Sequence, residues 1–334
     1  MNIKATAKNT WEILMNSFKG FSENKVTKLG GSLAYSTVFS MGPLLVVIIS
    51  LCGIFLGREA VEGKIYHELE GFLGRDTAIE LQEIIKKAAV SGKSTMAVII
   101  GGIALVIGST TVFGEIQDSI NDIWGLKPKP KKGWLKLIQN RFLSFSVIIG
   151  LGFVLLVSLG VTTLIDGFST KLQSYFAGTT VVVFYIVNQL LTLTIISLIF
   201  AVIFKVLPDA KIKWRDVMVG AVVTALLFML GKFGISIYIS KSNVGSTFGA
   251  AGSLVVMLLW IYYSSLILYF GAEFTKAYAI KHGSEILPNA YAVTTKQVEV
   301  ETGKASIQEK EKIADKTVKK VEQTIENKQV ESKL

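Results

Sequence analysis

The chain has 334 residues, 51% of them hydrophobic, and a formal net charge of +10. In a soluble domain such a charge would suggest nucleic-acid binding, but here the hydrophobic residues gather in long runs and the basic residues lie between the runs. That arrangement excludes an ordinary soluble globule and predicts membrane lipids, with no nucleic acid, as the partner of the basic residues. The single cysteine, Cys52, excludes an internal disulfide.

Six apolar runs have the length of membrane-spanning helices. A bilayer core about 30 Å thick requires roughly 20 apolar residues in a helix, and most of the runs are too long for a strand or an average soluble helix. We therefore predict an all-α fold, a polytopic membrane protein with a bundle of six transmembrane helices. The runs cover residues 33–56, 96–114, 142–165, 180–206, 217–239 and 254–270.

The basic residues predict the orientation of these helices. Lysine and arginine gather before the first run, between the second and third, and between the fourth and fifth, whereas the connections after the third and fifth runs contain only Lys171 and Lys241. Because cytoplasmic loops collect basic residues, both termini are expected in the cytoplasm. The connection 58–93 is long and of mixed charge, so it has little weight in this rule.

Three flanking segments differ from the runs. Residues 1–29 carry an apolar stripe among lysines, which predicts either an amphipathic helix at the membrane interface or a stripe packed beneath the bundle. Residues 58–93 predict two short amphipathic helices on the outer side. Residues 285–334 are rich in lysine and glutamate, which predicts a charged, mostly disordered cytoplasmic tail and leaves 30–284 as the transmembrane domain. The stripe in the first segment consists of Trp11, Leu14, Phe18 and Phe21.

Polar residues inside the runs are the candidates for function. Asn188 and Gln189 lie near the middle of the fourth run, with Thr192 one turn beyond Asn188. These side chains either hold helices together by hydrogen bonds or line a pathway. Pro43 lies near the middle of the first run and follows Ser40 by three residues. A proline there frees a backbone carbonyl, which is typical both of plain kinks and of transporter binding sites.

Lys232 is the only charge well inside an apolar run. It either extends its ammonium to the outer surface or pairs within the bundle. The first helix runs outward and the fourth inward, so their centres should lie near the same plane. We therefore predict a pathway between these two helices, with Lys232 toward its outer mouth. Its candidate residues are Ser40, Pro43, Asn188, Gln189, Thr192 and Lys232.

Signatures of soluble enzymes are absent from the sequence. It has no Walker-type phosphate loop and no glycine-rich dinucleotide motif. The two histidines, His67 and His282, lie in loops on opposite predicted sides of the membrane, which argues against a histidine-based metal site. We therefore expect no enzymatic activity, no metal and no cofactor.

Four stretches, taken together, resemble the YihY/BrkB family of bacterial inner-membrane proteins. They are residues 33–43, which end in Gly-Pro; residues 117–124, with the pattern Gln-x-x-x-Asn-x-Ile-Trp; residues 207–221, with Leu-Pro, Trp-Arg-Asp and Gly-Ala; and residues 248–273, with Leu-Trp-Ile-Tyr and Gly-Ala-Glu. Phe248 stands where the family usually has tyrosine, and Asp118 where a basic residue is common. The motif positions, expected to be structural, are Tyr35, Gln117, Asn121, Trp124, Pro208, Gly249, Trp260 and Glu273.

The resemblance implies six transmembrane helices in the bacterial inner membrane and a virulence-associated name, without an established molecular activity. Some members have carried a ribonuclease BN label, but the sequence shows no clustered metal ligands or acid–base pair that a nuclease needs. We predict a transporter-like protein that moves a lipid, an amphiphile or a small solute across the membrane. The alternative is a non-transporting scaffold or envelope-associated factor whose tail recruits a cytoplasmic partner. The sequence leaves a homo-oligomer open.

Overall fold

The computed structural model describes residues 3–56, 95–128, 179–241, 251–283, 285–289 and 292–295, with a few single positions between 63 and 83. The predicted helix over 142–165, most of the outer segment 58–93, Gly249 and the tail beyond Thr295 lie outside the described residues. The described part is mostly helical and belongs to one compact unit, Met1–Thr295.

Six helices make up most of the described chain. They are α1 (Ile3–Glu23), α2 (Val26–Leu56), α5 (Thr95–Trp124), α7 (Thr179–Val206), α8 (Trp214–Lys241) and α10 (Gly252–Lys281). The last five contain five of the six predicted apolar runs, which are thereby confirmed as helices. Among the described residues, three segments are apolar and long enough to cross a membrane: Ile186–Val206, Trp214–Ile235 and Leu254–Lys281.

Local backbone signals set the helix ends. Lys25 has a positive φ of 51° and separates α1 from α2. Gly125 and Gly283, each with φ 69°, follow the last residues of α5 and α10. Glycine takes this left-handed conformation without the steric penalty of a side chain, so both helices stop where the sequence supplies it. α2 continues as a helix through Pro43.

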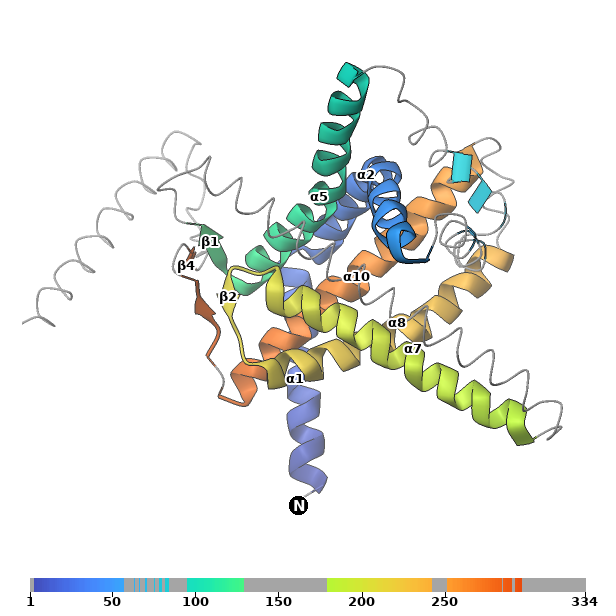
Figure 1. Cartoon of the computed structure of the whole chain (residues 1–334). Coiled ribbons are helices and arrows are strands. Elements are labelled where there is room, and N and C mark those ends of the chain that lie inside the picture. The colour runs from blue at the N-terminus through green and yellow to red at the C-terminus, as the bar shows by residue number, and fades with distance from the viewer. Residues whose placement is uncertain are drawn as a thin grey trace, which may run out of the picture. The chain divides into compact units, whose positions relative to one another are not determined.

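The long helices pack in a definite order, with α10 between α2 and α8 (Figure 1). α2 also packs on α5, α7 packs on α8, and α1 packs on α10. Two close approaches define the α8–α10 pair. A Cβ atom added at Gly220 would lie 1.9 Å from Thr275 Oγ1, and one added at Gly271 would lie 2.0 Å from Thr224 Oγ1. The residue numbers run in opposite directions, so α8 and α10 are antiparallel and nearly in backbone contact.

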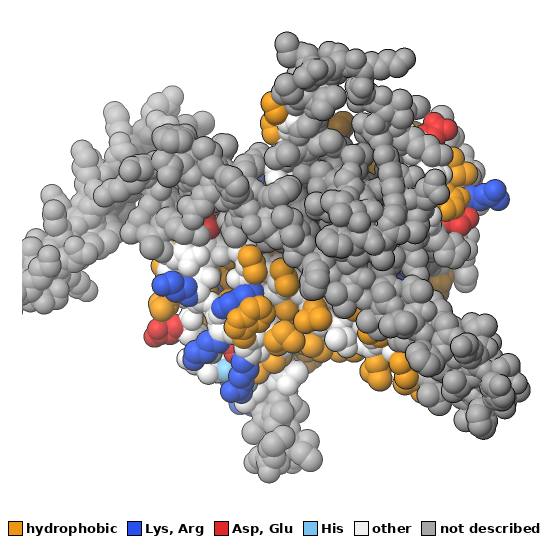
Figure 2. Space-filling model, viewed as in Figure 1, with side chains coloured by type: hydrophobic (Ala, Val, Ile, Leu, Met, Phe, Trp, Pro, Cys, Tyr) orange, Lys and Arg blue, Asp and Glu red, His pale blue; other side chains and the backbone are white. Residues whose placement is uncertain are grey.

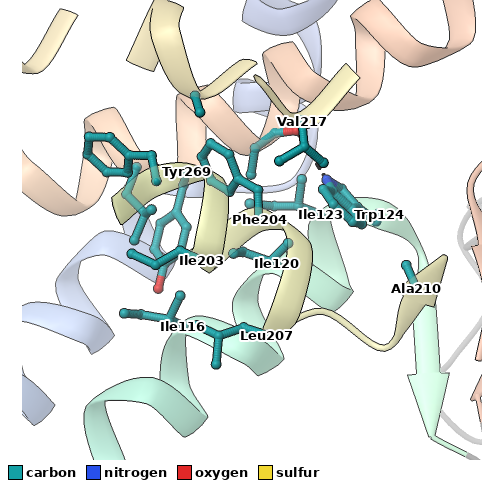
Figure 3. Close-up of a cluster of buried hydrophobic side chains, with 14 of the residues drawn as sticks. Ile116, Ile120, Ile123, Trp124, Ile203, Phe204, Leu207, Ala210, Val217 and Tyr269 are labelled. Carbon is teal, nitrogen blue, oxygen red and sulfur yellow. Dashed lines mark hydrogen bonds between the residues drawn. The ribbon is translucent and has the colours of Figure 1, made fainter. Parts of the chain in front are cut away.

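Two hydrophobic clusters hold the helices together. The larger lies where α5, α7, α8 and α10 meet, and Figure 3 shows its side chains from these helices pointing toward one another. Phe204 and Tyr269 are among its fully buried members. The smaller cluster joins Ile235 of α8 to Val256, Met257 and Trp260 of α10, with residues of α2 packed against it. Burial of this kind contributes about 25 cal/mol per Å² of apolar surface.

In the part of the chain that the structure describes, four short strands are added to the predicted all-α fold. β1 (Leu126–Pro128) pairs antiparallel with β4 (Ala292–Thr294), and β2 (Ala210–Lys211) pairs antiparallel with β3 (Leu287–Pro288). β3 and β4 belong to the segment 285–334 that the sequence assigned to the tail. The structure differs there because the chain after α10 folds back across the ends of α5 and α7, and the compact unit extends to Thr295.

Candidate functional site

Hydrogen bonds connect several helix ends in one region, which we call the helix-end junction. It contains the first turns of α2 and α8 and the last turns of α5, α7 and α10. Trp124 Nε1 donates to the Ala272 carbonyl at 3.1 Å, and Lys276 Nζ donates to the Ile123 carbonyl at 2.6 Å. These bonds attach the end of α5 to α10. Every helix end at the junction is one for which the basic flanking residues predict a cytoplasmic position.

A buried polar group connects α5 to the turn between α7 and α8. Asp209 is 1% exposed, and its carboxylate accepts hydrogen bonds from Gln117 Nε2 and Asn121 Nδ2, each at 3.1 Å. Asn121 Oδ1 in turn accepts the Asp209 backbone N–H at 2.8 Å. The Asn289 backbone N–H donates to the Asp209 carbonyl at 2.9 Å. Sequence reasoning found Gln117, Asn121 and the neighbouring Pro208, but it missed Asp209, the residue that they surround.

Glu273 of α10 occupies a second buried polar position. It is 2% exposed, and its Oε1 accepts a hydrogen bond from Asn24 Nδ2 at 2.5 Å. Gly20 of α1 makes room for the carboxylate, because a Cβ there would lie 2.4 Å from Glu273 Oε2. Lys276 is directed to the Ile123 carbonyl. The backbone of α1 therefore lies directly against a buried acid.

A cavity of about 270 Å³ opens beside Glu273, between α1 and α10. We call it the α1–α10 cavity. Lys281 donates a hydrogen bond to Glu12, and this bond holds the pKa of Glu12 below its usual range. Lys19 and Glu23 form an exposed pair at 3.7 Å. The polar side chains that line the cavity are Asn16, Lys19, Glu23, Glu273, Lys276 and Lys281.

α1 has a buried side and an exposed side, and the predicted stripe contributes residues to both. Ile13 and Ser17 are buried, and Phe21 is half-buried on the side that packs against α10. Trp11 and Phe18 are more than half exposed, and the ring of Phe18 lies 4.9 Å from that of Phe270. One side of α1 is therefore packed, as the second interpretation expects, and the other side is an exposed apolar surface whose contact with the membrane interface stays a prediction.

The predicted pathway residues lie on three helices. Ser40 is buried in α2, Asn188 and Gln189 are exposed on α7, and Thr192 is half-buried on α7. Lys232 is half-buried on α8. α7 packs mainly on α8, whereas the main described partners of α2 are α5 and α10. The α7 residues and Lys232 therefore lie on the packed pair of α7 and α8. Ser40 lies on α2, which is separated from α8 by α10.

Position along the helices places these residues at a similar level. Asn188 lies about five helical turns before the end of α7 at Val206, and Lys232 lies about five turns after the start of α8 at Trp214. With a pitch of about 5.4 Å per turn, both lie roughly 27 Å from the junction. Pro43 lies nearly as far along α2 from the start of that helix at Val26.

Tyr263 is a further polar residue at this level that sequence reasoning missed. It lies about five helical turns before the end of α10 at Lys281. A Cβ added at Gly231 would lie 1.7 Å from its hydroxyl oxygen, so the hydroxyl sits against the α8 backbone next to Lys232. Only the helix pairing reveals this contact, because nothing in the spacing of Gly231 and Tyr263 indicates it.

The motif residues are mostly buried at the junction or beside α10. Gln117, Asn121, Trp124, Pro208, Trp260 and Glu273 are all buried, whereas Tyr35 is 66% exposed and its ring lies 4.8 Å from that of Phe39. Among the described residues, no group of three or more His, Cys, Asp or Glu is arranged to hold a metal ion. The junction is thus built from amides, carboxylates and apolar side chains.

Comparison with known proteins agrees with the motifs. The sequence pattern of the family described as "Virulence factor BrkB" matches residues 17–293. A UPF0761 membrane protein of Aeromonas salmonicida is 27% identical over 260 residues, which cover 76% of this chain and 84% of the relative. One of Haemophilus influenzae is 27% identical over 258 residues, covering 77% and 91%. One of Mannheimia succiniciproducens is 28% identical over 265 residues, covering 76% and 85%.

The names of these relatives describe membrane proteins and state no enzymatic activity. No solved structure matches the chain. The family match covers most of the chain and includes the buried motif residues of the helix-end junction. The chain therefore belongs to the Virulence factor BrkB family and is a membrane protein, as the resemblance to the YihY/BrkB family indicated.

Proposed function

We propose that the chain crosses a bacterial inner membrane six times, with both termini in the cytoplasm. The helix ends that meet at the junction are those with the basic flanking residues. α5 and α7 both end there, so a six-span topology needs one crossing between Pro128 and Thr179. The apolar run 142–165 is long enough for that crossing. Packing and sequence thus support the same number of spans.

We further propose that the protein moves a lipid or another amphiphilic solute across this membrane. The observation that carries this proposal is the uneven burial of α7. Phe200, Ala201 and Phe204 are buried at the junction, whereas all residues from 186 to 190 are exposed. The cytoplasmic end is therefore closed by packed side chains, and the exposed outer part carries the amides of Asn188 and Gln189.

Amide side chains at this depth suit the passage of a polar headgroup. Hydrocarbon offers no hydrogen-bond partners, so an exposed amide in the membrane favours a polar ligand or a wet surface. Asn188 and Gln189 can exchange hydrogen bonds with a headgroup that moves along α7 and α8. The ammonium of Lys232, on the neighbouring helix at the same level, attracts a phosphate. Pro43 lies at a similar level on α2, across α10, and Ser40 lies nearly one helical turn closer to the junction.

Lipid transfer in reconstituted vesicles tests this function. Purified protein is placed in vesicles that contain a fluorescent phospholipid, and a membrane-impermeant quencher reports how fast lipid moves between leaflets. Asn188→Leu and Lys232→Leu should each slow the transfer by at least about tenfold, since each removes a polar group from the path. The matched control is Thr194→Val, because the Thr194 hydroxyl donates to the Leu190 carbonyl of its own helix at 2.8 Å.

The same variants separate a pathway from a structural role. If Asn188 only forms an interhelical hydrogen bond, Asn188→Leu lowers the free energy of unfolding by about 0.6 to 2 kcal/mol and leaves the transfer rate unchanged. That result would remove Asn188 from the pathway. Unchanged transfer in both leucine variants would reject the site.

A scaffold is the second candidate, and the pairing of β1 with β4 favours it. The Thr295 N–H donates to the Gly125 carbonyl at 2.7 Å, so the residues beyond 295 start from the helix-end junction. A tail attached there is well placed to recruit a cytoplasmic partner. Deletion of residues 296–334 should release such a partner without changing lipid transfer. A wild-type protein that moves no lipid, with a partner lost on this deletion, would favour the scaffold.

A further inference from the structure

We propose that the α1–α10 cavity binds the headgroup of a zwitterionic, amine-bearing phospholipid, namely phosphatidylethanolamine, at the cytoplasmic surface. The proposal rests on the proposed topology for the placement of this end of the molecule. It does not require that the protein transports lipid, so binding and transport can fail separately.

The carboxylate of Glu273 provides the place for the amine. It is 2% exposed, lines the cavity, and within the described part of the chain accepts one hydrogen bond, from Asn24 to Oε1. A buried carboxylate is stabilised by hydrogen bonds and by a nearby positive charge. A primary ammonium supplies both, because it carries three N–H donors. The choline headgroup has a trimethylated nitrogen, which offers no N–H donor.

Three lysines provide the place for the phosphate. Lys19 lies on α1, and Lys276 and Lys281 lie on α10. Each ammonium has three donors. Lys276 gives one to the Ile123 carbonyl and Lys281 gives one to Glu12, so donors remain for phosphate oxygens. Figure 2 shows most of the visible lysine and arginine side chains gathered at one end of the described surface, next to hydrophobic side chains.

The balance of charges favours a zwitterion over an anionic lipid. The lysines of the cavity carry three positive charges. Glu23 and Glu273 in the lining and Glu12, which is paired with Lys281, carry three negative charges. The positive and negative charges around the cavity balance in number but lie at different places. A headgroup with one phosphate and one ammonium has the same property. An anionic headgroup has no ammonium of its own to place against the Glu273 carboxylate.

Depth and the neighbouring apolar surface favour a lipid over a soluble headgroup. Glu273 and Lys281 lie in the last turns of the segment Leu254–Lys281, after its charge-free part ends at Phe270, by roughly 5 and 16 Å along the helix. Headgroups occupy the layer just outside the hydrocarbon core. Met15 is 51% exposed and precedes Lys19 by one helical turn on the same side of α1. Together with Trp11 and Phe18 it forms an exposed apolar surface beside the cavity. Acyl chains can pack on this surface while the headgroup enters the cavity.

The test measures lipid binding to the purified full-length protein in detergent, by native mass spectrometry and by thermal stabilisation. The probes are phosphatidylethanolamine, phosphatidylcholine and phosphatidylglycerol with identical acyl chains, and glycerophosphoethanolamine as the headgroup without chains. The wild-type protein should prefer phosphatidylethanolamine over phosphatidylcholine by about tenfold, the effect of a charge-assisted hydrogen bond. Glu273→Gln should reduce this preference to within about twofold, because it removes the charge and keeps the shape.

A second variant covers the case in which Glu273→Gln does not fold. Lys19→Gln changes an exposed side chain and should weaken the binding of both zwitterionic lipids, while the preference for the amine stays. Lys213→Gln, an exposed lysine outside the cavity, is the matched control and should change nothing. Equal binding of the two zwitterionic lipids by the wild type, or tighter binding of phosphatidylglycerol, would overturn the proposal. Binding of glycerophosphoethanolamine as tight as that of the lipid would show that the occupant is not a lipid.

Discussion

Asn121→Ala provides a direct measure of the helix-end junction. Asn121 is 4% exposed and makes two hydrogen bonds with Asp209, one to its carboxylate at 3.1 Å and one from its backbone N–H at 2.8 Å. Truncation removes a charge-assisted bond, worth about 1.5 to 3 kcal/mol, and leaves a buried N–H without this acceptor, which costs about 1 to 3 kcal/mol. Because the two losses overlap when the site relaxes, we expect the free energy of unfolding to fall by about 3 kcal/mol.

Asp122→Ala is the matched control for this change. Asp122 is the next residue of α5, and its side chain is exposed. Asparagine and aspartate have similar helix propensities, so replacement by alanine changes the helix itself by a similar amount at both positions. The control should therefore alter the free energy of unfolding by no more than about 0.5 kcal/mol.

Unfolding in mixed micelles with increasing SDS, followed by tryptophan fluorescence, measures both variants under the same conditions. A double-mutant cycle between Asn121→Ala and Asp209→Ala should give a coupling energy of about 1 to 2 kcal/mol, since the two side chains are in contact. Equal effects of Asn121→Ala and Asp122→Ala, or a coupling energy near zero, would refute the idea that this pair attaches α5 to the turn after α7.

Three further predictions concern packing, the strand pairs and topology. Gly220→Ala should lower the free energy of unfolding by about 1 to 3 kcal/mol in the same micelle assay, because its Cβ would lie 1.9 Å from Thr275 Oγ1. Gly234→Ala on the same helix, with nothing within 4 Å, should be neutral or stabilising by up to about 1 kcal/mol. Gly125→Ala, at φ 69° and with a Cβ 2.9 Å from the Thr295 carbonyl oxygen, should speed protease cleavage near residues 292–295, whereas Gly31→Ala should not. In a Cys52→Ser background, Pro130→Cys should react with thiol reagents from the cytoplasm and Asn243→Cys from outside; the reverse pattern would disprove the topology.

The sequence was sufficient for the helices because run length is a strong signal. An apolar segment of roughly 17 or more residues has few stable alternatives to a helix, and five such runs are helical in the described chain. The order of packing could not be predicted, since helices that are apolar on all sides show no preferred face. The close approach of Gly220 to Thr275 becomes visible only when α8 and α10 are known to be partners.

The polar sites were predicted only in part, for a related reason. Gln117 and Asn121 stood out through their motif, but Asp209 lies 88 residues beyond Asn121, and local spacing carries no information about such a contact. The partner of Glu273 could not be predicted for the same reason, because Asn24 lies 249 residues away in the sequence. The strand pairs involve only two or three residues each, which is too short for an alternating pattern to appear.

The location of the motif residues bears on what family membership can say about function. Asn121 bonds to Asp209, Trp124 bonds to the Ala272 carbonyl, and Glu273 bonds to Asn24. The first two contacts connect the helix ends at the junction and would be needed by any protein with this junction, whatever it carries. Glu273 differs because it also borders a cavity with lysines. The residues that select a ligand should therefore be those of the α1–α10 cavity and those near Asn188 and Lys232. Variants at the other motif positions should act mainly by lowering stability.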